Sequence, residues 1–338
     1  MNAPVLEIHD LRVGFPVYGG VLRHKVAEVL AVDGVSLTLQ PGETLGLVGE
    51  SGSGKTTVGR AVINLLRPTV PDVRLGGQIL YRPRHGERVD LNGLSRKEMH
   101  PLRAEIQMIF QDPFSSLNPR MTVGQIVGRP LELHTDLDRP ARKRKVEALL
   151  DRVGLQAAYA ERYPHEFSGG QRQRIGIARA LSTNPRIVVA DEPVSALDVS
   201  VQAQVINLMA ELQEEFGLTY LFIAHDIGVV YHVSDRIAVM YLGSIAEIGT
   251  AEQVYRSSRH PYSRALLSAI PQPNPHRTRA HRVVLQGDIP TPLARPSGCG
   301  FRTRCPIAVP ECAVAPPPFV EVQPGHHAAC PFTEALPS

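Results

Sequence analysis

One short stretch constrains this chain more than any other. Residues 49–56 read Gly-Glu-Ser-Gly-Ser-Gly-Lys-Thr, a complete Gly-x-x-x-x-Gly-Lys-[Ser/Thr] pattern. The apolar run at 44–48 predicts a buried strand before it, and the spacing of apolar residues at 57–66 predicts a helix after it. Glycines between a strand and a helix N-terminus turn backbone N–H groups and the helix dipole towards an anion. The pattern therefore predicts a site for nucleotide phosphates.

The residue types in this loop indicate separate chemical tasks. Lys55 supplies positive charge to the β- and γ-phosphates, and the Thr56 hydroxyl can ligate Mg²⁺. ATP and Mg²⁺ are therefore the expected cofactors. The other residues expected to bind ATP here are Gly49, Ser51, Gly52, Ser53, Gly54 and Thr57.

Composition and charge limit what the nucleotide can drive. The 338 residues are 43% hydrophobic and 20% charged, which is ordinary for a globular protein, and the formal net charge is +3. This small charge gives no reason to expect nucleic acid as a partner. No apolar run approaches the roughly 18–20 residues that span a bilayer, and residues 1–10 lack the pattern of a secretory signal. We therefore expect a cytosolic protein that reaches a membrane only through a partner.

The order of the expected elements indicates an α/β fold. Alternating residues predict antiparallel strands at 5–14 and 29–39, apolar runs predict buried strands at 187–190 and 218–224, and residues 113–185 are helical in character. Strands that alternate with helices favour a parallel sheet with covered faces. We expect a phosphate-loop ATPase core with a mostly parallel sheet, an antiparallel β subdomain, an inserted helical subdomain and an irregular Cys- and Pro-rich C-terminal extension.

Two domains follow from this order. Residues 1–255 are expected to form the nucleotide-binding domain, with the helical subdomain at about 113–185. Residues 256–338 are expected to form the extension, because prolines are frequent there and all four cysteines lie in it.

Two carboxylates stand at the end of the apolar run at 187–190. In a phosphate-loop ATPase an aspartate at this place, here Asp191, binds the Mg²⁺ shell. A carboxylate just beyond it, here Glu192, can polarise the attacking water as general base. Paired carboxylates are also common in solvent-facing loops, but the phosphate loop upstream favours the catalytic interpretation.

A second anion-binding pattern lies between these two motifs. Ser168, Gly169, Gly170 and Gln171 precede a plausible helix at 172–181, and small residues before a helix N-terminus suit an anion. One γ-phosphate does not need two such sites in one subunit. We therefore expect this site to close on a nucleotide held by a second subunit.

These motifs resemble those of ABC transporter ATPases. Residues 168–171, with Gln-Arg-Ile-Gly-Ile-Ala-Arg-Ala at 173–180, are similar to the family's signature sequence and stand in the family's order. The resemblance implies that Gln111 is the Q-loop residue, which links Mg²⁺ and water to the region touching the membrane subunit. It also implies that Asp198 belongs to the D-loop and that His225 is the switch histidine at the γ-phosphate.

The resemblance covers residues 5–255 and implies an adenine-stacking aromatic residue near the N-terminus. Phe15 falls at that place, and Tyr18 is its rival. The family's mechanism further implies two ATPase subunits, identical or homologous, each completing the other's site.

Three further segments indicate a particular subfamily of these ATPases. Residues 110–120, 260–271 and 295–306 resemble regions of oligopeptide and dipeptide importer ATPases. The implied function is an ATPase subunit that powers peptide import at the cytoplasmic face of the inner membrane. The implied partners are a second ATPase subunit, two transmembrane permease subunits and an extracytoplasmic solute-binding protein. Nickel and glutathione importers share much of this pattern, so these cargoes stay open, and a non-transport ATPase is the alternative of another class.

The extension holds the cysteines of the chain. In a reducing compartment they are expected to be ligands rather than disulfides. Their separations of five, six and seventeen residues lack the close pair that zinc sites usually contain, whereas Cys-Pro, present twice, also ends ferredoxin cluster motifs. Some peptide-importer ATPases with such a tail bind a [4Fe–4S] cluster, so the resemblance implies a cluster first, zinc second and unligated thiols third. The ligands would be Cys299, Cys305, Cys312 and Cys330.

Overall fold

The chain forms two compact units, each assembled from separate segments. The computed structural model describes residues 3–19, 24–270, 285, 287, 288, 290, 291 and 293–332. We call one the helical unit, residues 1–6, 39–43 and 80–223, and the other the phosphate-loop unit, residues 7–38, 44–79 and 224–338. Among the described helices we find none whose length and apolar character would let it cross a membrane.

The phosphate-loop unit is built on a mixed sheet. Strand β3 (Thr44–Val48) runs parallel to β9 (Arg236–Tyr241), and β10 (Ser244–Thr250) returns antiparallel to β9. Every residue of β3 is buried. A strand in a parallel sheet covered on both faces has this continuous apolar character, so the strand predicted before the loop is confirmed.

The C-terminal segment adds two strands to this sheet. β12 (His326–Ala328) pairs antiparallel with β10, and β11 (Val320–Gln323) pairs with β12. The sequence predicted an irregular extension and did not reveal these strands. Both strands are short. They form because the edge of β10 supplies backbone partners, and a local sequence pattern does not predict such long-range pairing.

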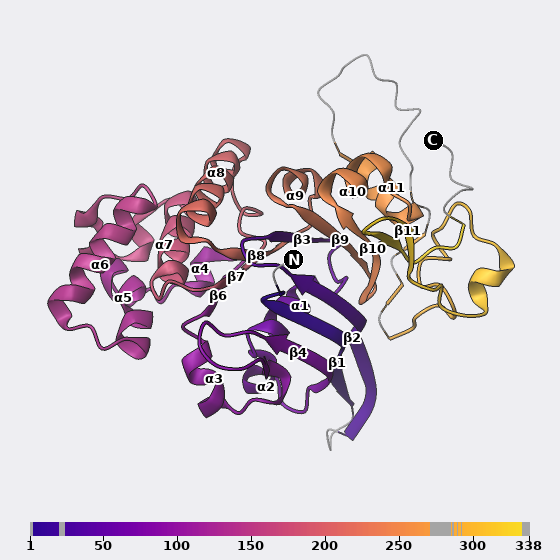
Figure 1. Cartoon of the computed structure of the whole chain (residues 1–338), viewed down its shortest axis with the longest axis horizontal. Helices are drawn as coiled ribbons and strands as arrows, with labels where there is room; N and C mark the ends of the chain where they lie inside the picture. Colours follow the sequence, from indigo (N-terminus) through magenta and orange to yellow (C-terminus); the bar gives the residue numbers. More distant parts are fainter. Residues whose placement is uncertain are drawn as a thin grey trace, which may run out of the picture. The chain divides into compact units, whose positions relative to one another are not determined.

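Helices of the phosphate-loop unit lie beside β9 and β10 (Figure 1, orange); they are α9 (Ile227–Val233), α10 (Ala251–Ser257) and α11 (Pro261–Ser268). At the loop, α1 (Lys55–Val62) is followed by α2 (Leu66–Thr69). The helix predicted at 57–66 therefore ends early. Asn64 has φ 50°, a left-handed conformation with which a right-handed helix cannot continue.

A second sheet holds β2 (His24–Leu39), β1 (Leu6–Gly19) and β4 (Arg74–Tyr81) in that order. The last two residues of β4 pair antiparallel with β5 (Val89–Asp90) in the helical unit. The strands predicted at 5–14 and 29–39 are therefore present, within β1 and β2.

The helical unit holds three parallel strands. β6 (Ile106–Ile109) pairs with β7 (Ile187–Asp191), and β7 pairs with β8 (Thr219–Ala224). All residues of β7 and β8 are buried. The connections between these strands carry helices, as parallel strands require.

Helices α5, α6 and α7 pack together (Figure 1, magenta) and bury apolar side chains such as Val127, Leu150 and Ile175. The inserted helical subdomain predicted from the sequence is therefore present. The helices of this unit are α3 (Arg96–Leu102), α4 (Pro113–Ser116), α5 (Val123–His134), α6 (Arg139–Arg152), α7 (Gly169–Leu181) and α8 (Val199–Phe216). Short 3₁₀ turns lie at Leu91–Gly93, Ala157–Glu161 and Pro164–Glu166, and in the other unit at Pro310–Ala313.

Candidate nucleotide-binding site

The phosphate loop connects β3 to α1. At one position of this loop the backbone conformation requires glycine. Gly54 precedes α1 with φ 104°. A Cβ added to it would lie 2.3 Å from the Ala31 carbonyl oxygen. Because the helix begins directly after this glycine, its first backbone N–H groups are available to phosphate oxygens.

Lys55 lies inside this loop. Its Nζ donates hydrogen bonds to the carbonyl oxygens of Gly49 at 2.7 Å and Glu50 at 2.9 Å. Ser53 Oγ lies 3.3 Å from the same nitrogen. The side chain is buried, and the loop closes around its ammonium group. Positive charge thus stands at the centre of the loop, where the sequence placed it.

Thr56 and Thr57 occupy the first turn of α1 and are half-buried. Ser51 and Gly52 are exposed at the tip of the loop. His225 follows the last residue of β8 and is exposed. On β1, Phe15 is half-buried, whereas Tyr18 is 41% exposed and donates from its hydroxyl to Asp72 Oδ2 at 2.6 Å.

The helical unit brings two of the predicted catalytic residues together. Gln111 Nε2 donates a hydrogen bond to Glu192 Oε2 at 2.9 Å, although the two residues lie 81 positions apart. Asp191 ends β7 and is only 2% exposed. The two neighbouring carboxylates therefore differ in environment, since Glu192 is only half-buried.

The serine and glutamine of the signature motif form a capping box at the start of α7. Gln171 N–H donates to Ser168 Oγ at 3.3 Å, and Ser168 N–H donates to Gln171 Oε1 at 3.0 Å. Gly170 lies against α8, because an added Cβ would lie 2.6 Å from Val201 Cγ1. Ser168 is exposed and Gly169 half-buried, and the exposed Asp198 precedes α8.

These residues divide between the two units. The phosphate loop, Phe15 and His225 belong to the phosphate-loop unit, whereas Gln111, the two carboxylates, the signature residues and Asp198 belong to the helical unit. Direct contacts join Gln111 to Glu192 in one unit and Lys55 to its own loop in the other.

Two residues of the C-terminal extension contact the phosphate loop. Glu50 N–H donates to the Tyr262 hydroxyl at 2.8 Å, and the Glu50 carboxylate accepts from Arg304 at 2.7 and 3.1 Å. Sequence reasoning assigned no role to these three residues. Arg304 and Glu50 lie 254 positions apart, and only the general likeness of residues 260–271 and 295–306 to importer tails pointed to these segments. Pro271 lies outside the described residues.

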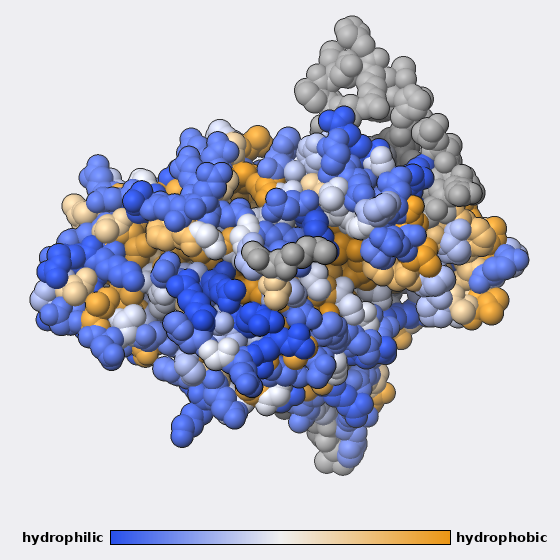
Figure 2. All heavy atoms as spheres, in the orientation of Figure 1, coloured by the Kyte–Doolittle hydropathy of each residue, from blue (hydrophilic) through white to orange (hydrophobic). Residues whose placement is uncertain are grey.

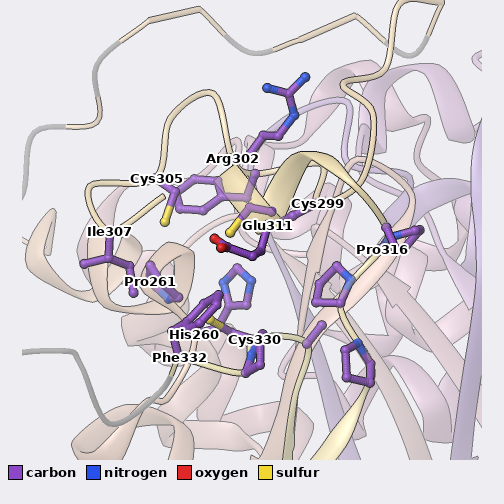
Figure 3. Close-up of a pocket in the computed structure, with 17 residues that line it drawn as sticks. His260, Pro261, Cys299, Arg302, Cys305, Ile307, Glu311, Pro316, Cys330 and Phe332 are labelled. Atoms are coloured by element: carbon purple, nitrogen blue, oxygen red, sulfur yellow. The ribbon is translucent and has the colours of Figure 1, made fainter. Parts of the chain in front are cut away.

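The predicted cysteine ligands line one cavity of about 180 Å³ in the phosphate-loop unit. Figure 3 shows Cys299, Cys305 and Cys330 around it, and Cys299 N–H donates to the Cys312 carbonyl at 2.7 Å. Burial raises the pKa of Cys305 to about 11 and also raises the pKa values of Cys299 and Cys330. These three thiols therefore hold their protons at neutral pH.

The cavity does not amount to a formed metal site. The described residues include no group of three or more His, Cys, Asp or Glu side chains placed to hold a metal ion. Neutral thiols do not attract one another, and metal–thiolate bonds are what draw such a set together. The four predicted ligands thus line one cavity, but the described residues do not place them as a metal site.

Hydrophobic side chains gather at the surface of the cysteine-rich segment, on the right of Figure 2 where Figure 1 shows it in yellow. Val314 is 83% exposed and Phe319 46% exposed. With few regular elements, this segment buries its apolar side chains incompletely.

Strand, glycine loop and helix with a buried lysine define a nucleotide-binding α/β protein. The family model for ABC transporters matches residues 32–195, and the model for the oligopeptide/dipeptide transporter C-terminal region matches residues 246–312. The chain is 52% identical to the oligopeptide transport ATP-binding protein AppF of Bacillus subtilis over 96% of each chain. It is 51% identical to OppF of Salmonella typhimurium over 93% of this chain and 92% of that protein.

Solved structures agree with this assignment. The ATP-binding cassette MJ0796, a dimer in a post-hydrolysis state bound to ADP and Pi, is 28% identical with a TM-score of 0.61 over 73% of this chain and 98% of its own. CbiO1 from Clostridium perfringens, part of the transporter complex cbiONQ, is 26% identical with a TM-score of 0.61 over 76% and 92%. The chain belongs to the oligopeptide/dipeptide family of ABC transporter ATPases. It is an ATPase, and the predicted family and fold class are confirmed.

Proposed function

We propose that this chain is the ATP-hydrolysing subunit that powers the import of di- and oligopeptides through a membrane permease complex. The observation that carries the proposal is the near full-length similarity to oligopeptide transport ATP-binding proteins, which extends through the C-terminal region. A phosphate loop folded around Lys55 supports the ATPase role. The subunit acts at the cytoplasmic face of the inner membrane, bound to its permease.

We also propose the domain division that suits this function. Residues 1–255 form the nucleotide-binding domain, with the helical subdomain at about 113–185, and residues 256–338 form the importer-type extension. The partners are a second ATPase subunit, two permease subunits and an extracytoplasmic solute-binding protein.

The loop binds the nucleotide through its backbone N–H groups and through the Lys55 side chain. Phosphate oxygens accept from the backbone N–H groups between Gly49 and Gly54 and from the first turn of α1, and Lys55 turns from the loop carbonyls to the β- and γ-phosphates. Phe15 stacks on adenine. Tyr18 is less suited to this role because its hydroxyl is bonded to Asp72.

Hydrolysis uses the carboxylates after β7. Thr56, Gln111 and Asp191 would hold Mg²⁺, which would neutralise phosphate charge. Glu192 takes a proton from water as the water oxygen attacks the γ-phosphorus. The bond from the γ-phosphorus to the bridging oxygen breaks, and ADP leaves with the bond electrons. His225 contacts the γ-phosphate.

A second subunit completes the site. The start of α7 closes on the nucleotide held by the partner subunit, through Ser168, Gly169, Gly170 and Gln171. Asp198, which precedes α8, lies at the same interface. ATP then joins the two subunits and hydrolysis releases them, which gives a two-state cycle that a permease can follow.

Reconstitution tests the transport role. The chain is co-expressed with candidate permease and solute-binding proteins of a peptide importer, and phosphate release is measured in vesicles with and without peptide-loaded binding protein. We expect peptide to stimulate hydrolysis, and Lys55→Ala to abolish it. Stimulation by nickel or glutathione instead of peptides would reassign the cargo, and a chain that binds ribosomes rather than a permease would overturn the importer role.

The cysteine cavity supports a separate proposal of a [4Fe–4S] cluster bound by Cys299, Cys305, Cys312 and Cys330. Four cysteines on one cavity match the ligand number of such a cluster. The full chain is purified without oxygen and its metal and sulfide contents are measured, with Cys305→Ser as the matched variant. About four irons and four sulfides per chain, reduced in the variant, are expected. Stoichiometric zinc without iron or sulfide would refute the cluster.

A further inference from the structure

Glu50 is the one carboxylate within the phosphate loop, and the C-terminal extension holds it at two points. The Arg304 guanidinium donates to both of its carboxylate oxygens, from Nη1 at 2.7 Å and from Nη2 at 3.1 Å. The Tyr262 hydroxyl accepts from its backbone N–H at 2.8 Å. The Arg304 side chain is only 7% exposed and that of Glu50 is 24% exposed, so solvent screens this ion pair weakly.

Aromatic packing fixes the two residues that hold Glu50. The Tyr262 ring lies 4.6 Å from that of Tyr241 and 5.4 Å from that of Phe301, between ring centroids. Arg304 N–H donates to the Phe301 carbonyl at 3.0 Å, which ties the arginine to this cluster through a tight turn. The guanidinium therefore meets Glu50 with little freedom to move, as a bidentate pair needs.

Glu50 also contacts Lys55, the lysine of the loop. Its carbonyl oxygen accepts from Lys55 Nζ at 2.9 Å. Left unpaired, the Glu50 carboxylate would place a negative charge in a loop that must accept the negative phosphates of a nucleotide. At low effective dielectric such like charges repel strongly. Arg304 cancels this charge and keeps the side chain turned towards the extension.

We propose that Arg304 is a positioning residue for nucleotide binding, which acts through Glu50 by neutralising it and by fixing the loop in its phosphate-binding form. The extension is then a working part of the nucleotide site. This inference rests on the ATP-binding role proposed above for the phosphate loop.

The test compares nucleotide affinities of the full-length chain by fluorescence titration with mant-ATP and mant-ADP. Arg304→Gln leaves the Glu50 carboxylate unpaired, and we expect it to weaken mant-ATP binding about tenfold and mant-ADP binding less, because repulsion grows with phosphate charge. Arg304→Lys keeps the charge but loses the bidentate contact, so its mant-ATP affinity should lie between those of the parent chain and Arg304→Gln. The matched control is Arg256→Gln, which breaks the exposed ion pair with Glu252 in the same unit and should bind like the parent.

The double variant Arg304→Gln with Glu50→Gln separates charge from folding. It removes both partners, so we expect mant-ATP affinity to return to within about threefold of the parent value. Equal losses for ATP and ADP, or no recovery in the double variant, would contradict the proposal, and so would parent-like binding by Arg304→Gln. If the parent chain itself bound neither nucleotide, the ATP-binding role of the loop would fail instead.

Discussion

Gln111 and Glu192 are joined by a hydrogen bond of 2.9 Å between side chains that come from the ends of neighbouring strands. Glu192 has φ 45°, a left-handed conformation that is uncommon for a residue with a side chain. Its N–H donates to Ile223 O at 2.8 Å, and Ser195 Oγ donates to its carbonyl at 3.1 Å. The strained backbone aims the carboxylate, which suits a general base.

Replacing Glu192 with Gln removes the base and keeps the shape. We expect hydrolysis to fall by about 10²–10⁴-fold while ATP still binds, so that ATP traps the two-subunit state. Phosphate release and size-exclusion chromatography in ATP measure the two effects. Glu132→Gln, at an exposed ion pair with Arg129 on α5, is the control and should hydrolyse like the parent. Hydrolysis at the parental rate in the Glu192 variant would refute the general-base assignment.

Replacing Gln111 with Glu places a second carboxylate beside Glu192. Like charges at this distance raise the pKa of the pair, so less of the base is ionised at a given pH. Hydrolysis should fall at neutral pH and recover as the pH rises, with the acid limb of the pH profile about one unit higher than in the parent. A uniform loss at every pH would mean that Gln111 acts only on Mg²⁺ or on the permease.

Ser168→Asp separates the two roles of the signature serine. Aspartate caps a helix as well as serine does, so the melting temperature should stay near that of the parent. The added charge would face the γ-phosphate of the partner's nucleotide, so ATP-driven dimerisation should be lost. Thr122→Asp makes the same change in the capping box of α5 and should leave dimerisation intact. Parent-like dimerisation by Ser168→Asp would remove the serine from the interface.

Arg179 ties the signature helix to the segment after the Q-loop. Its Nη1 donates to the Ser116 carbonyl at 2.7 Å, and burial lowers its pKa. Arg179→Ala opens a cavity and leaves this carbonyl without its donor, so the free energy of unfolding should fall by about 2–4 kcal/mol. Urea denaturation measures the loss. Arg129→Ala, at an exposed position of α5, should cost no more than about 0.5 kcal/mol.

Much of the fold could be predicted because it depends on patterns of neighbouring residues. The apolar run at 44–48 became β3, the run at 187–190 became β7, and the capping pair Ser168 and Gln171 marks the start of α7. Helix ends were less predictable. The first helix stops at Val62, and Asn64 two residues later has a left-handed backbone that ends the helical run.

The sequence by itself determined the family, the fold class and the order of the nucleotide motifs, since glycine spacing, apolar runs and capping residues act over a few neighbouring positions. Only the tertiary structure decided the pairing of Gln111 with Glu192, the ion pair of Arg304 with Glu50, and the addition of β12 to β10 and of β11 to β12. The physical reason is the same in each case. A long-range partner is chosen by burial and charge in the folded chain, and local sequence carries no record of that choice.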